Sequence, residues 1–118
     1  MKRLAIKFNG IGLGCYFYTD YENFKKHHVY NREAKKDNTL GQSAGNGIWV
    51  DIYGKDVYTT IVHEISHYMD VVLGECLKIT DMEQASELRG RMTGYLFGEI
   101  SKYVASLIGE NCNQKGRK

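Results

Sequence analysis

Two histidines four residues apart, with a glutamate directly after the first, are the residues of this chain best suited to chemistry. The stretch His63-Glu64-Ile65-Ser66-His67 has the spacing H-E-x-x-H. On an α-helix, residues four apart lie on one face, so His63 and His67 can direct two imidazoles at one metal ion. Glu64 points off that pair, where it can reach a metal-bound water but is poorly placed to bind the metal. The spacing therefore predicts a zinc site with two ligands, a general base and an open coordination position.

The residues before the motif predict a strand that leads directly into a helix. Segment 48–53 alternates in character, and its apolar set Ile48, Val50 and Ile52 is expected to face the core. The other set is aromatic and acidic, as expected of an exposed or edge face, although packing on the sheet is favoured for Trp49. Asp56 suits the N-cap of the motif helix, and Gly74 suits its end. A plain helix with two surface or core histidines is the alternative.

A second helix is predicted after the motif. Thr80-Asp81-Met82-Glu83 has the pattern of a capping box, and the helix is expected to end near Ile108. Glycine recurs at every fourth position within it. Because glycine weakens a helix by up to about 1 kcal/mol relative to alanine, such a stripe predicts that another backbone approaches closely there. The glycines are Gly90, Gly94 and Gly98.

A catalytic zinc ion usually takes three protein ligands and keeps water in the fourth position. Asp70, one turn beyond His67, is better suited to a hydrogen bond to an imidazole. Glu83 is expected to close the capping box. Glu87 is the preferred third ligand, with Glu83 as its substitute, and an ion pair of Glu87 with Arg91 is the alternative. The full set of candidates is Asp70, Glu75, Glu83, Glu87, Glu99, His27 and His28.

The first 47 residues predict supporting structure. Residues 4–8 and 15–18 have strand character and are expected to form a hairpin. A capping box at 19–22 begins a helix that is expected to reach about Lys36. His27 and His28 on this helix are expected to be solvated or half-buried, with a role in binding substrate as the alternative. Residues 37–47 are rich in Asn, Gly, Ser and Gln, which predicts a flexible loop.

Length and composition indicate one soluble domain. With 118 residues the chain can form a single modest core, and we expect one domain over 1–118 with a frayed tail at 110–118. A net charge of +2 gives no reason to expect nucleic acid as a partner. Three cysteines, Cys15, Cys76 and Cys112, do not describe a disulfide framework. Without a signal-peptide core or a membrane-length apolar segment, the expected location is the cytoplasm, with no membrane partner.

The motif, together with Glu87-Leu88-Arg89-Gly90, resembles the gluzincin pattern, in which H-E-x-x-H is followed by E-x-x-A on a second helix. The stretch 87–97 is also similar to the corresponding helix of small phage-type metallopeptidases, or minimal gluzincins. The resemblance covers about residues 48–98. It departs from the pattern at Gly90, which replaces the usual alanine. A competing register begins at Glu83, in which Glu83 binds zinc and Glu87 supports a histidine.

The resemblance implies a fold and an activity. The implied fold is a zincin-like α+β domain, with a small mixed or antiparallel sheet packed on the active-site helix and a second long C-terminal helix. The implied activity is zinc-dependent cleavage of peptide or protein substrates, with Glu64 as general base. The strand at 48–53 is expected to pair with an extended peptide along its edge. The oxyanion donor is left open among Tyr58, Tyr68, Tyr95, His27 and His28.

Two other functions compete with the peptidase. A zincin-fold protein without turnover would bind or regulate a partner, but it would have no need of the base Glu64. A zinc amidohydrolase acting on a small, non-peptide amide would use the same residues. The short chain, which has no room for a large substrate-binding domain, keeps this last possibility open.

Overall fold

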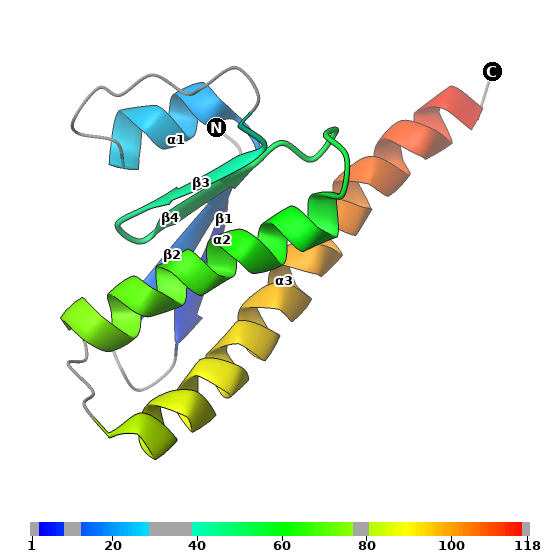
Figure 1. Cartoon of the computed structure of the whole chain (residues 1–118). Helices are drawn as coiled ribbons and strands as arrows, with labels where there is room; N and C mark the ends of the chain where they lie inside the picture. The colour runs from blue at the N-terminus through cyan, green and yellow to red at the C-terminus, as the bar shows by residue number, and fades with distance from the viewer. Residues whose placement is uncertain (1–2, 9–12, 29–38, 77–80, 117–118) are drawn as a thin grey trace.

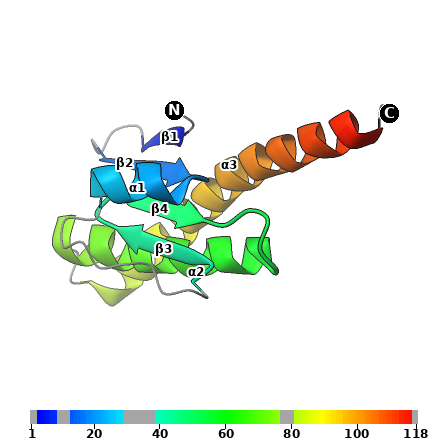
Figure 2. The same cartoon turned by 90° about the horizontal axis from the view of Figure 1, so that it is seen from above.

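The computed structural model describes residues 3–8, 13–28, 39–76 and 81–116 (Figures 1 and 2). In these residues a four-stranded sheet separates helix α1 (Tyr21–His28), on one face, from α2 (Val57–Val71) and α3 (Met82–Gly116), on the other. This arrangement confirms the predicted α+β class. No helix in the described part of the chain has the length and apolar character needed to cross a lipid bilayer.

The sheet is mixed, with the strand order β1-β2-β4-β3. Strands β1 (Arg3–Phe8) and β2 (Leu13–Tyr18) pair antiparallel, which confirms the predicted N-terminal hairpin. Strand β4 (Gly47–Val50) runs parallel to β2 and antiparallel to β3 (Gly41–Ala44). After β2 the chain forms α1 and then rejoins the sheet at β3, the edge strand opposite β1.

Two expectations about the sheet are wrong. Residues 41–44, which were expected to belong to a flexible loop, form the edge strand β3. Strand β4 ends at Val50 instead of reaching residue 53, and it is paired on both sides, so it has no free edge. The sequence Gly-Gln-Ser-Ala has no β-branched or aromatic residue, and β3 is extended because it pairs with β4 across a two-residue turn at Gly45 and Asn46.

The main core lies between the sheet and the two long helices. As predicted, Ile48, Val50 and Ile52 are buried in it. Helix α2 contributes an apolar stripe, and α3 contributes residues at helical spacing, which is the pattern of one buried face on each helix. The helical members of this core are Ile61, Ile65, Tyr68 and Met69 from α2, and Met92, Leu96, Ile100 and Val104 from α3.

A second, aromatic cluster lies on the other face of the sheet. Trp49 is 3% exposed and packs with Tyr18 and Phe24, because α1 covers this face. The prediction that Trp49 packs on the sheet is therefore confirmed. The prediction that its side of the strand is exposed or at an edge is wrong for this residue. His28 also lies on this face: its Nε2 is 2.8 Å from the Tyr18 hydroxyl.

Two helices begin one residue later than their predicted capping boxes. Asp20, not Thr19, caps α1, because its Oδ1 accepts the Glu22 amide at 3.2 Å. Asp81 caps α3 by accepting the Gln84 amide at 2.9 Å, while Thr80 lies outside the described residues. Aspartate and threonine are both good N-caps, so the pattern fixes the cap only to within one residue.

Helix α3 differs from its prediction in length and in its environment. It continues to Gly116, past the expected end near Ile108, and it extends beyond the sheet (Figure 1). A Cβ atom placed at Gly90, Gly94 or Gly98 would meet nothing within 4 Å. Among the described residues no other backbone approaches this stripe, so the predicted close approach is wrong for that part of the chain. The motif helix is also extended, by a π-helical turn at Val72–Cys76.

Candidate metal centre

Helix α2 directs the two motif histidines to solvent. Its buried stripe at Ile61 and Ile65 packs on the sheet, and this leaves His63 and His67 on the exposed side, one turn apart. Their Nε2 atoms are 3.1 Å apart, with the ring planes inclined at 86°. In the absence of a metal, one Nε2–H can donate to the other ring at this distance.

The histidine pair fits a zinc ion. Tetrahedral zinc with Zn–N bonds of about 2.0–2.1 Å holds two ligand nitrogens roughly 3.3 Å apart. The observed 3.1 Å between the Nε2 atoms of His63 and His67 is close to that separation. Two neutral imidazoles one helical turn apart can therefore act together as ligands with little movement of either ring.

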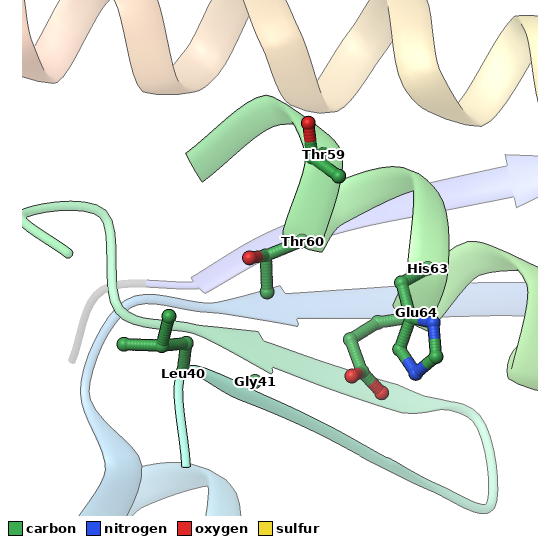
Figure 3. Close-up of a pocket in the computed structure, with 6 residues that line it drawn as sticks. All are labelled: Leu40, Gly41, Thr59, Thr60, His63 and Glu64. Carbon is green, nitrogen blue, oxygen red and sulfur yellow. The ribbon is translucent and has the colours of Figure 1, made fainter. Parts of the chain in front are cut away.

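Glu64 lies between α2 and the edge strand. It is 6% exposed, and its side chain reaches from the helix toward β3 beside His63 (Figure 3). Burial raises the pKa of this carboxyl, while the neighbouring imidazoles of His63 and His67 and a hydrogen bond from the Ser43 hydroxyl oppose the rise. A carboxylate in this position is a stronger proton acceptor than an exposed glutamate.

A pocket of about 380 Å³ opens at His63 and Glu64. Figure 3 shows its lining: Leu40, Gly41, Thr59, Thr60, His63 and Glu64. Gly41 lets β3 lie close to α2, because a Cβ atom there would be 2.8 Å from Thr60 Cγ2 and 3.0 Å from Glu64 Cγ. The pocket therefore joins the start of the edge strand to the part of α2 that carries the motif.

The candidates for the third ligand are not gathered at the histidine pair. Glu87 is exposed and accepts Arg91 Nη2 at 2.7 Å, which is the alternative considered for it. Glu83 is exposed near the start of α3, and Asp81 caps this helix without its help. Within the described ranges, no three His, Cys, Asp or Glu side chains are grouped so that they could hold one metal ion.

Asp70, the candidate for orienting an imidazole, connects the two long helices. Its Oδ1 accepts Arg89 Nη2 at 2.5 Å, and the two side chains are 62% and 38% exposed. This ion pair links the end of α2, one turn after His67, to the first turns of α3. Arg89 is two residues from Glu87, so the segment that carries the proposed third ligand is tied to the motif helix.

Three other candidates, His27, His28 and Tyr68, lie away from the pocket lining. His27 and His28 are half-buried, as expected, on the opposite face of the sheet from α2. Tyr68 is buried in the core, where its hydroxyl donates to the Gly14 carbonyl at 3.0 Å. Sequence reasoning missed Gly41 and Ser43. Only the glycine signals the close approach of β3, and nothing in the local sequence identifies the serine.

Comparisons of the chain with models of protein families, with curated proteins and with solved structures find no match. A function must therefore be inferred from the chemistry of the histidine pair, the buried glutamate and the pocket beside them.

Proposed function

We propose that the chain is a zinc-dependent peptidase in which His63 and His67 bind the metal and Glu64 is the general base. The observation that carries the proposal is the 3.1 Å separation of the two Nε2 atoms, next to a buried carboxylate that lines a pocket. A purely structural zinc site is usually closed by four protein ligands and has no use for an adjacent base. Two imidazoles, a base and an accessible pocket suit catalysis better.

The proposal assigns the third ligand to Glu87, with Glu83 as the alternative. The ion pair of Glu87 with Arg91 is exposed on both sides. Such i,i+4 pairs contribute only about 0.3–0.5 kcal/mol, so a metal bond can readily replace this one. The Asp70–Arg89 pair ties the first part of α3 to α2. Glu87 lies two residues before Arg89 and so on another face of the helix, and α3 would have to turn about its axis for Glu87 to complete the site.

Bound zinc would supply a Lewis acid that lowers the pKa of water and polarises a carbonyl. Glu64 would take the proton of the attacking water and pass it to the leaving nitrogen. Burial favours this role, because it raises the pKa of the carboxyl and so makes the carboxylate a stronger proton acceptor.

The edge of β3 is the proposed docking line for an extended peptide, in place of the strand at 48–53. The Asp51 amide donates to the Leu40 carbonyl at 2.9 Å, so residue 40 belongs to a hydrogen-bonded pair of the β3–β4 ladder. Because such pairs alternate along an antiparallel ladder, the backbone groups of Gly41 and Ser43 point away from β4. A peptide that pairs with them would pass beside the pocket.

Two measurements test this function. Metal analysis of the purified protein should find close to one zinc per chain. A peptide library should be cleaved by the wild type and not by Glu64→Gln, which should still bind zinc. Cleavage retained in Glu64→Gln would remove the base assignment. Zinc binding with hydrolysis only of small amides would instead favour the amidohydrolase.

A further inference from the structure

Strand β3 lies against the helix that carries the motif. The contact is closest at Gly41, where a Cβ atom would touch both Thr60 and Glu64. Successive residues of a strand face opposite sides, so Ser43 shares the side of Gly41 that faces α2, and Gln42 faces the side covered by α1. The cross-strand partners agree, because Ser43 is opposite Ile48 of the main core and Gln42 is opposite Trp49 of the aromatic cluster.

The side chain of Ser43 contacts that of Glu64. Glu64 is 6% exposed, and the Ser43 hydroxyl donates a hydrogen bond to its carboxylate. A donor on one oxygen restricts the orientation of a buried carboxylate, and a carboxylate has a second oxygen that can also accept. Orientation of this kind is what a general base needs, because proton transfer requires hydrogen-bond distance to the reacting water.

Ser43 also directs its main chain to the side of β3 that no described strand pairs with. It belongs to a non-hydrogen-bonded pair of the β3–β4 ladder, so its N–H and C=O point away from β4. The residue that would bond to a docked peptide through its backbone is therefore the residue that holds Glu64 through its hydroxyl. A peptide paired at this edge would restrain Ser43, and through it the base.

We propose that Ser43 is a positioning residue that fixes the Glu64 carboxylate and couples it to an extended chain bound along the edge of β3. The inference rests on the proposed peptidase function, since it names how that site aligns its base when substrate binds.

Kinetics test the positioning role. Ser43→Ala should lower kcat about tenfold with KM and zinc content nearly unchanged, because the backbone pairing and the histidines remain. Ser43→Thr, which keeps the hydroxyl, should restore most of kcat. The matched control is Gln42→Ala on the same strand but the other face, which should leave kcat within about twofold. Equal rates for wild type and Ser43→Ala, or no recovery in Ser43→Thr, would overturn the role.

A double-mutant cycle tests the contact without any activity. Unfolding of the metal-free wild type, Ser43→Ala, Glu64→Ala and the double variant should show non-additivity of at least fivefold in the unfolding equilibrium constant, because alanine at position 64 leaves no acceptor for the Ser43 hydroxyl. Additivity within about twofold would disprove the contact and with it the positioning role. If the cycle shows coupling but the wild type cleaves no peptide in the library, the contact is established, whereas the peptidase function and the positioning role that depends on it are both rejected.

Discussion

At the scale of single residues, the burial of Glu64 has two consequences that depend on each other. Removing the carboxylate from water raises its pKa, and the two imidazoles and Ser43 limit that rise. The same burial needs β3 to lie close against α2, and Gly41 provides that approach. A glycine whose backbone is unremarkable in its own strand is therefore required for the position of the base.

Gly41→Ala is expected to disturb both stability and chemistry. The new Cβ would be 2.8 Å from Thr60 Cγ2 and 3.0 Å from Glu64 Cγ, closer than such atoms tolerate. Overpacking of this kind typically costs about 1–3 kcal/mol, and relief by moving β3 would also displace Glu64. The free energy of unfolding, measured by urea denaturation, and kcat should both fall, whereas the zinc content should stay the same. Unchanged kcat with lowered stability would show that β3 can shift without moving the base.

At the scale of elements, the glycine stripe of α3 is a sequence pattern whose expected structural reason, close packing, is not found. Glycine at every fourth position suggests a packing surface, yet Gly90, Gly94 and Gly98 face open space in the structure. The helix therefore bears the conformational cost of three glycines without a packing gain from the residues that the structure describes.

Alanine at these glycines should stabilise the protein. Gly90→Ala and Gly94→Ala should each raise the free energy of unfolding by about 0.5–1 kcal/mol, since alanine is the better helix former and its Cβ meets no neighbour. Urea titrations of the single variants measure the gain. Destabilisation by either variant would mean that another backbone does pack against this face.

The docking of α1 on the sheet should depend on pH through His28. The Tyr18 oxygen accepts a hydrogen bond from Arg3 and lies 2.8 Å from His28 Nε2, where a neutral imidazole can accept the phenol proton. Burial lowers the pKa of His28 below its ordinary value, and the charges of His27 and Arg3 lower it further. The unfolded chain therefore binds this proton more readily, and stability rises with pH in that range.

The resulting stabilisation is complete above about pH 6.5, the ordinary pKa of histidine, and it declines as the pH falls from there toward the lower folded pKa. Trp49, the single tryptophan, packs against Tyr21 and Phe24 at this interface, so its fluorescence reports on α1. Wild type should lose stability between pH 7 and 5 faster than His28→Gln, while His27→Gln, which removes one of the smaller causes of the His28 shift, should lie between the two. Parallel pH profiles for wild type and His28→Gln would refute the assignment.

At the scale of the whole molecule, the sequence predicts the elements better than their relative rotation. Apolar alternation identifies the β1–β2 hairpin and the buried face of β4, and helical periodicity identifies α2, because these patterns are local. Strand β3 has no such pattern, and it is extended because it pairs with β4. The spacing of His63 and His67 fixes their geometry on one helix, which the 3.1 Å separation confirms. Whether Glu87 reaches them depends on the rotation of α3 about its own axis, and the buried face of α3 at Met92 and Leu96 leaves Glu87 exposed beside Arg91.

Zinc should therefore act on the stability of the whole domain, and it should do so differently in variants of the two glutamates. A ligand that binds only the folded state stabilises it by about 2.7 kcal/mol at a free concentration about 100 times Kd. For a domain of this size, that corresponds to a rise in Tm of about 10 °C. We expect this rise in the wild type, reversed by a chelator, abolished in His63→Ala and much reduced in Glu87→Ala, with Glu83→Ala close to wild type.

A larger loss in Glu83→Ala than in Glu87→Ala would transfer the ligand role to Glu83. The same Tm with and without zinc in the wild type would contradict the metal site itself, because two imidazoles held 3.1 Å apart would then serve only each other.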